Sequence, residues 1–155
     1  MKIIIVLFLI YLFMILPRMF NKPDRKPFMG YHYAHRGLFN NDSETPENSL
    51  PAFKKAVEKG YGIELDVQLT KDDKLVVFHD ASLKRMCNID GKVWEYTLEE
   101  LQHMTLSGSS QTIPTFEEVS YSGDFSFVSI AQSPNYTPEK ADFILDVFRE
   151  YIDEI

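Results

Sequence analysis

The stretch Ile63-Glu64-Leu65-Asp66-Val67 decides the predicted fold of this chain. Apolar and acidic residues alternate in it, so in a β-strand Glu64 and Asp66 project from one face and their apolar neighbours from the other. Two carboxylates on one face of an otherwise apolar strand cost free energy unless a positive charge lies between them. Because carboxylate oxygens are ligands that hard cations prefer, the stretch predicts a site for Mg²⁺ or Ca²⁺.

Two histidines stand at the ends of the apolar runs on either side of this strand. His35 follows residues 31–34, His79 follows residues 75–78, and Arg36 comes directly after His35. Imidazole changes its protonation near neutral pH, and a guanidinium binds phosphate oxygens in a paired geometry. Together with the two carboxylates, these residue types predict a metal-dependent phosphodiesterase centre.

The remaining pattern alternates strands with helices. Strands are expected at residues 31–35, 63–69, 75–79 and 125–131, and helices at residues 48–59, from 97, from 115 and from 137 to 155. Asn48 is the expected N-cap of the first helix. The terminal helix is expected to bury an apolar face that includes Phe143 and Ile144. This order predicts an α/β fold with a parallel sheet and right-handed crossovers.

Charge and cysteine content argue against a nucleic-acid partner and exclude an intrachain disulfide. The net charge of −7 over 155 residues leaves no basic stripe, so no nucleic-acid partner is expected. A single cysteine, Cys87, excludes a disulfide within the chain and agrees with a reducing compartment. The remaining content, 45% hydrophobic and 14% aromatic, is sufficient for a packed core.

An uninterrupted apolar run covers residues 3–16. It predicts a membrane anchor at residues 1–20, followed by a linker at 21–29 and a catalytic-type domain at 30–155. Basic residues on the C-terminal side of the run predict a single-pass membrane protein whose domain faces the cytoplasm. A cleaved signal peptide and a segment lying in the bilayer interface remain alternatives.

Several motifs in sequence order carry a resemblance to a known family. They are Tyr33-Ala34-His35-Arg36-Gly37, Pro46-Glu47-Asn48-Ser49, Glu64-Leu65-Asp66-Val67-Gln68-Leu69-Thr70-Lys71-Asp72, Val76-Val77-Phe78-His79-Asp80 and Ile113-Pro114-Thr115-Phe116-Glu117-Glu118-Val119. Over residues 33–120 the chain resembles the glycerophosphodiester phosphodiesterases. One such motif is weak, but five in the family's order are specific.

The resemblance implies a fold, a reaction and a set of roles. The fold is a TIM-type (β/α) barrel of the PLC-like phosphodiesterase kind, with an insertion at about residues 80–106 after the third strand. The reaction is hydrolysis of glycerophosphodiesters to glycerol 3-phosphate and an alcohol, through a cyclic phosphate, and a lysophospholipid is the other expected substrate. The implied roles are general acid and base for His35 and His79, phosphate binding for Arg36, and ligation of Mg²⁺ or Ca²⁺ by Glu64 and Asp66. Glu47 is expected beside the metal or orienting a histidine.

The chain departs from the family at the expected fourth strand. The family places a third metal-binding glutamate and a phosphate-binding lysine there, whereas residues 125–133 contain neither. A complete barrel typically takes about 250 residues, so about four β/α units, half a barrel, are expected. The alternative function is therefore a truncated, catalytically impaired member that acts as a membrane-tethered binding module or is a remnant. Pairing of two copies into a homodimer and sphingomyelinase-D-like lipid cleavage are further alternatives.

Overall fold

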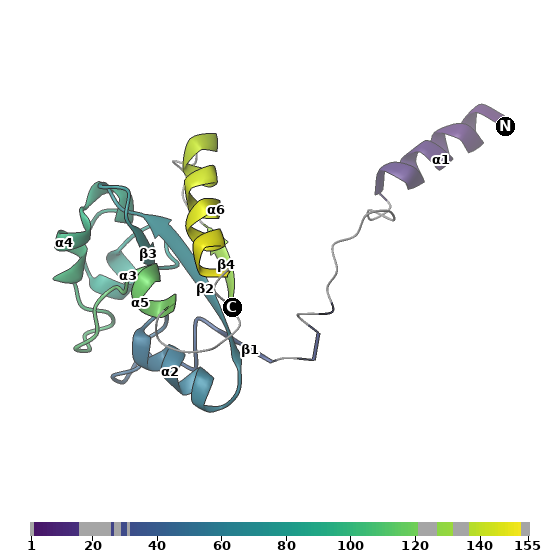
Figure 1. Ribbon diagram of the computed structural model, residues 1–155. Coiled ribbons are helices and arrows are strands. Elements are labelled where there is room, and N and C mark those ends of the chain that lie inside the picture. The colour runs from purple at the N-terminus through teal and green to yellow at the C-terminus, as the bar shows by residue number, and fades with distance from the viewer. Residues whose placement is uncertain are drawn as a thin grey trace. The chain divides into compact units, whose positions relative to one another are not determined.

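The computed structural model describes residues 2–15, 26, 29–30, 32–120, 127–131 and 137–152. The chain divides into two units, residues 1–31 and 32–155. Helix α1 (Lys2–Ile15) belongs to the first unit, and the second unit contains a four-stranded sheet with its covering helices (Figure 1).

Helix α1 is too short for the predicted membrane anchor. Its 14 residues rise about 21 Å, whereas the hydrocarbon core of a bilayer is about 30 Å thick. Among the described residues, no helix combines the length and the apolar character needed to cross a membrane. The prediction of a single-pass membrane protein with its domain facing the cytoplasm is therefore wrong. Residues 16–20, the last part of the predicted anchor, lie outside the described part of the chain.

Strand β2 (Gly62–Leu69) is the centre of the sheet. Strand β1 (Tyr33–His35) pairs with the first half of β2 in parallel, and β4 (Phe127–Ala131) pairs in parallel along the other edge of β2. Both β1 and β4 therefore run in the same direction as β2, which is the arrangement that the alternation of strands and helices predicts.

Strand β3 (Leu75–Val77) corrects one prediction, because it runs antiparallel to β2. The two strands are joined by a tight turn in which the Thr70 N–H donates to the Lys74 carbonyl at 2.9 Å. A parallel connection needs a dozen or more residues, and the segment between Leu69 and Leu75 is far shorter. The expected all-parallel sheet is thus wrong at this strand, which forms a hairpin with β2.

Three helices cover one face of the sheet: α2 (Leu50–Glu58), α5 (Phe116–Ser120) and α6 (Pro138–Ile152). They bury one apolar cluster with the inward side chains of the strands, namely Ala34, Phe53, Ala56, Ile63, Leu65, Val67, Leu69, Leu75, Val77, Phe116, Val119 and Ile144. The predicted apolar face of the last helix is confirmed at Ile144, which is 3% exposed, but not at Phe143, which is 45% exposed.

The start of α2 corrects another prediction. Ser49, not Asn48, is the N-cap, and its hydroxyl accepts a hydrogen bond from the Ala52 N–H. Asn48 lies outside the helix with φ of +55°, in the left-handed region that asparagine tolerates better than most residues. Its side chain is therefore available to the site described below.

The segment after β3 forms a small second core. It contains α3 (Lys84–Cys87), the 3₁₀ turn η2 (Val93–Glu95) and α4 (Leu98–Gln102). Their apolar residues bury a cluster of their own: Val76, Phe78, Leu83, Met86, Val93, Leu101, Met104, Leu106 and Ile113. The expected insertion thus packs on Val76 of β3 and on Phe78, and α3 lies beside the end of β3 (Figure 1).

Candidate active site

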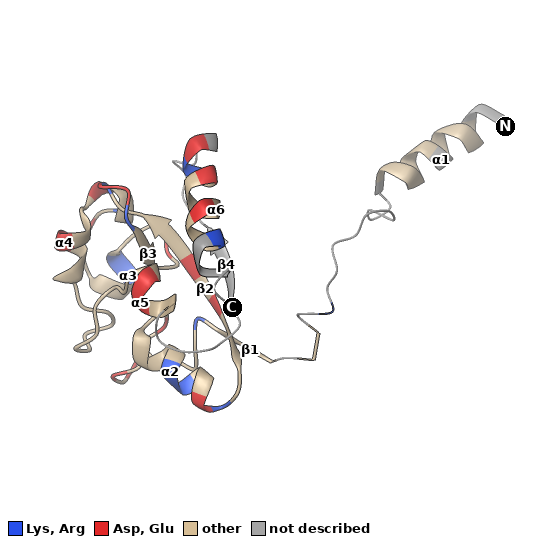
Figure 2. Cartoon of the chain, in the orientation of Figure 1, with Lys and Arg blue, Asp and Glu red and all other residues tan. Residues whose placement is uncertain are grey.

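The alternation predicted for β2 is confirmed. Ile63, Leu65 and Val67 are fully buried in the main core, while Glu64 and Asp66 project from the other face. Figure 2 shows these acidic positions in red within β2, and basic positions in blue in α3. Glu64 and Asp66 therefore lie on the face of β2 that the covering helices leave free.

His35 and Glu64 meet across the β1–β2 pair. The parallel register places His35 opposite Glu64, and its Nε2 lies 3.8 Å from Glu64 Oε2. The His35 side chain is 68% exposed, so its imidazole is open to a ligand from solution. Glu64 Oε2 is buried and accepts no hydrogen bond, a costly state for a carboxylate oxygen unless a cation or another donor reaches it.

Arg36 is held by its backbone in an uncommon conformation. Its φ is +58°, its N–H donates to the Glu64 carbonyl at 2.9 Å, and its carbonyl accepts from the Asn48 N–H at 3.0 Å. Its side chain donates from Nη1 to Glu47 Oε1 at 2.9 Å, and its Nε lies 3.7 Å from Asp66 Oδ2. The guanidinium is thus fixed between two carboxylates before any substrate binds.

Glu47 is the most fully satisfied carboxylate of the site. It accepts hydrogen bonds from Arg36, from Asn41 and twice from Arg85, whose Nη1 and Nη2 lie 3.0 and 2.6 Å from its two oxygens. Burial alone would raise the pKa of Glu47, but the hydrogen bonds and charge of Arg85, with Asn41 and Arg36, lower it to about 2. Glu47 therefore remains ionised at any ordinary pH.

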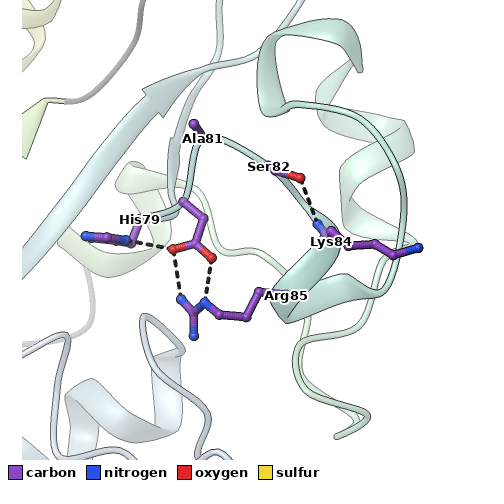
Figure 3. A pocket seen from close by; sticks show the side chains of 6 residues that line it. His79, Ala81, Ser82, Lys84 and Arg85 are labelled. Carbon is purple, nitrogen blue, oxygen red and sulfur yellow. Dashed lines mark hydrogen bonds and ion pairs between the residues drawn. The ribbon is translucent and has the colours of Figure 1, made fainter.

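Asp80 connects His79 to Arg85, the residue that also binds Glu47. The His79 Nδ1 lies 2.8 Å from Asp80 Oδ1, and Arg85 donates to both oxygens of Asp80 at 2.6 and 2.9 Å (Figure 3). Burial would raise the pKa of Asp80, but the hydrogen bonds from Arg85 and His79 lower it. These residues border an open hollow of about 500 Å³, lined by His79, Asp80, Ala81, Ser82, Lys84 and Arg85.

The structure thus joins the predicted residues in two groups. In the first group His35 lies beside Glu64. In the second group Asp66 contacts Arg36, and Glu47 connects Arg36 through Arg85 and Asp80 to His79. The sequence did not predict Arg85, nor the contact of Asn48 Nδ2 with Asp66 Oδ2 at 3.5 Å. The position of Arg85 six residues after His79 gave no signal by itself, because its partner Glu47 lies 38 residues away.

The donor set suits a divalent cation in part. Among the described residues, no three His, Cys, Asp or Glu side chains lie close enough together to hold a metal ion. Glu64 and Asp66 nevertheless supply two carboxylates on one strand face, and one of their oxygens has no hydrogen-bond partner. Mg²⁺ is commonly bound by one or two carboxylates, with water and substrate phosphate as the other ligands, so this pair fits such an ion.

Strand β4 runs beside the strand that carries this pair. Its register places Ser129 opposite Leu65 and Ile130 opposite Asp66. Residues 127–131 read Phe-Val-Ser-Ile-Ala, without the glutamate or lysine that the resemblance leads one to expect. Residues 125–126 and 132–133, the rest of the stretch expected to form the fourth strand, lie outside the described residues.

Comparisons with known proteins agree on one family. The model of the Glycerophosphoryl diester phosphodiesterase family matches residues 35–142. A glycerophosphodiester phosphodiesterase of Bacillus altitudinis is 48% identical over an alignment of 94 residues, and the match covers 56% of this chain and 37% of that protein. The chain thus spans little more than a third of the length of this curated relative.

Solved structures give the same result. The glycerophosphodiester phosphodiesterase of Thermotoga maritima is 35% identical with a TM-score of 0.62, and the match covers 77% of this chain and 50% of that one. A phosphodiesterase of Oleispira antarctica, solved in complex with the product sn-glycerol-3-phosphate, is 30% identical with a TM-score of 0.58, over 69% of this chain and 46% of that one.

Proposed function

Because the chain belongs to the glycerophosphoryl diester phosphodiesterase family, we propose that its site hydrolyses glycerophosphodiesters to glycerol 3-phosphate and an alcohol. The observation that carries the proposal is the placement of His35 and Arg36 at the end of β1, beside Glu64 and Asp66 of the parallel strand β2. The ends of parallel strands are where α/β barrels place reactive residues. The product complex of the Oleispira antarctica relative supports glycerol 3-phosphate as the product.

Arg36 is assigned to the phosphate. Glu47 holds one end of its guanidinium, and the Arg36 Nε is buried without a hydrogen-bond partner. A phosphoryl oxygen bound to this group would gain a charge-assisted hydrogen bond from a donor whose orientation is already fixed. The positive φ at Arg36 supports this role, because uncommon backbone conformations are retained where function requires a fixed direction.

His35 and His79 are assigned to proton transfer. One histidine takes the proton from the glycerol hydroxyl next to the ester, whose oxygen then bonds to phosphorus. The other histidine gives a proton to the oxygen of the departing alcohol as its bond to phosphorus breaks. Water then opens the resulting cyclic phosphate with the two histidines in exchanged roles, so the protons balance over one turnover.

Glu64 and Asp66 are assigned to Mg²⁺ or Ca²⁺. When bound, the cation would neutralise charge that develops on the phosphoryl oxygens. Glu47 is a less suitable ligand, because four donors already occupy its two oxygens. In this proposal Glu47 acts on the phosphate indirectly, by orienting Arg36.

The domain is assigned to residues 30–155, with residues 21–29 as the linker before it. Within it, β1, β2 and β4 correspond to neighbouring parallel strands of a barrel of the phosphodiesterase kind, and β3 to a hairpin beside them. Pairing of two copies stays a prediction, which the sedimentation mass of the purified chain tests.

The test is release of glycerol 3-phosphate from glycerophosphocholine with Mg²⁺ or Ca²⁺ present. His35→Ala should lower kcat/KM by about 10²- to 10⁴-fold, the usual contribution of a general acid or base. His103→Ala is the matched control, because His103 is an exposed histidine at the end of α4 and should leave the rate unchanged. Equal background rates for the wild type and His35→Ala would refute hydrolysis by this chain.

A second candidate function is binding of phosphate esters without hydrolysis. Strand β4 favours it, since Ile130 stands opposite Asp66 and residues 127–131 provide no carboxylate or ammonium group. Titration calorimetry with glycerol 3-phosphate separates the two functions. Binding that is lost in Arg36→Met, together with absence of turnover, would identify the binding function; turnover that depends on His35 would reject it.

A further inference from the structure

The backbone around His79 is fixed to β2 independently of the imidazole. Gln68 Nε2 donates to the carbonyls of Phe78 and Asp80 at 2.9 and 2.8 Å, and the Phe78 N–H donates to the Asp66 carbonyl at 2.9 Å. Gln68 itself is 1% exposed, so these bonds are shielded from water. These bonds fix the backbone at His79, but they do not determine which nitrogen of its ring carries the proton.

The ring of His79 has one described hydrogen-bond partner, the Asp80 carboxylate. An ionised carboxylate only accepts hydrogen bonds, so the Nδ1 that lies 2.8 Å from it must carry the proton. In a neutral imidazole the other nitrogen, Nε2, then has a free lone pair. In Figure 3 dashed lines join the His79 ring and the Arg85 guanidinium to one carboxylate, which is that of Asp80.

Arg85 holds Asp80 in that position. Its Nε and Nη2 reach the two oxygens of Asp80, while its Nη1 and Nη2 reach the two oxygens of Glu47. The Arg85 side chain is 47% exposed, whereas its two partners are 20% and 5% exposed. Arg85, which belongs to the insertion, thus links Asp80, the partner of His79, to Glu47, the partner of Arg36.

We propose that Arg85 is a positioning residue of the site: by fixing the Asp80 carboxylate against Nδ1, it keeps the proton of neutral His79 on Nδ1 and leaves Nε2 to accept a proton. This assigns to His79 the part of general base in the first step and to His35 that of general acid. The assignment of roles depends on the proposed function, whereas the tautomer of His79 does not.

The matched control is Lys84, the preceding residue of α3. Its ammonium pairs with the exposed Asp90 at 3.1 Å, and no contact with Glu47, Asp80 or His79 is described for it. Arg85→Met and Lys84→Met therefore remove the same charge from the same helix. Only the first removes the hydrogen bonds to Asp80.

The experiment is ¹⁵N NMR of the imidazole nitrogens in the whole chain, at a pH where His79 is neutral and with its signals assigned through His79→Ala. The wild type and Lys84→Met should show Nδ1 protonated, and Arg85→Met should show a clear gain of the tautomer protonated at Nε2. Arg85→Lys should lie between them, because an ammonium lacks the planar fork that grips two carboxylates. If Arg85→Met fails to fold, Arg85→Lys carries the test.

An unchanged His79 tautomer in the folded Arg85 variants would overturn the proposal, as would an equal change in Lys84→Met. The kinetic readout is separate: kcat for glycerophosphocholine should fall about 10- to 100-fold in Arg85→Met, with a smaller change in KM. If the tautomer shifts as expected but the wild type releases no glycerol 3-phosphate, the positioning role stands and the proposed hydrolysis fails.

Discussion

The two halves of the site treat their carboxylates in opposite ways. On one side Glu47 and Asp80 are saturated by Arg85, Arg36, Asn41 and His79, and their pKa values are lowered. On the other side Glu64 has a buried oxygen without a hydrogen bond, and the contact described for that oxygen is with the exposed His35 imidazole at 3.8 Å. Among the described residues, protein side chains satisfy the carboxylates of the first half, whereas Glu64 Oε2 in the second half has no hydrogen-bond donor.

The two halves differ in whether their carboxylates are suited to orient a guanidinium group or to bind a cation. A group that accepts four hydrogen bonds from its own protein has little capacity left for a metal ion, but it orients guanidinium groups well. A buried carboxylate that lacks donors has the reverse property, because a cation would relieve the cost of its burial. The four predictions below test this division.

The largest effect is expected from breaking the saturated half. Glu47→Gln leaves Arg36 and Arg85 without their shared counter-charge in a position only 5% exposed, and should lower the free energy of unfolding by about 3–5 kcal/mol. Urea denaturation at neutral pH measures it. Glu58→Gln, an exposed residue at the end of α2, is the control and should change stability by less than about 0.5 kcal/mol. A similar small change in Glu47→Gln would contradict the account of this half.

The same carboxylate makes stability depend on pH. Its pKa falls from an ordinary value near 4.5 to about 2 in the folded protein, so its contribution is fully present above pH 4.5 and is lost as the pH falls toward 2. The contribution is about 3 kcal/mol. Unfolding of the wild type and of Glu47→Gln should therefore differ by that amount at neutral pH and converge near pH 2. Parallel pH curves for the two proteins would refute the prediction.

The open half should respond to a divalent cation. Mg²⁺ or Ca²⁺ at a concentration one hundredfold above its Kd should stabilise the wild type by about 2.7 kcal/mol, and Glu64→Gln should lose most of this gain. Thermal unfolding with and without the cation measures it, with Glu58→Gln again as the matched control. An equal shift of Tm in Glu64→Gln and the wild type would place the cation elsewhere.

The smallest effect is expected at Asn48, whose N–H donates to the Arg36 carbonyl and whose side chain contacts Asp66. Its φ of +55° is unfavourable for alanine, so Asn48→Ala should destabilise the fold by about 1–2 kcal/mol. Asn48→Gly tolerates the backbone and loses only the weak 3.5 Å contact with Asp66, so it should cost less than Asn48→Ala. Equal losses in the two variants would show that the side-chain contact, not the backbone, dominates at this position.

Several features of the fold could be predicted from sequence because they depend on neighbours in the chain. The alternation along β2 follows from the period of a strand, and the capping boxes at Thr97 and Thr115 follow from the Glu three residues later; both are present. The reversal of β3 was also readable, since the short connection from Leu69 to Leu75 cannot cross over a sheet. The order of strands and helices alone, which predicts a parallel sheet, carries no information on the length of this turn.

The sequence by itself determined the family, the strand that carries Glu64 and Asp66, and the residue types at the ends of β1 and β3. Only the tertiary structure decided that Arg85 joins Glu47 to Asp80 and that Asn48 serves the site rather than the helix. The physical reason is range. Periodicity and capping act over a few residues, whereas a charged network depends on which distant side chains the packed insertion brings within about 3 Å of one another.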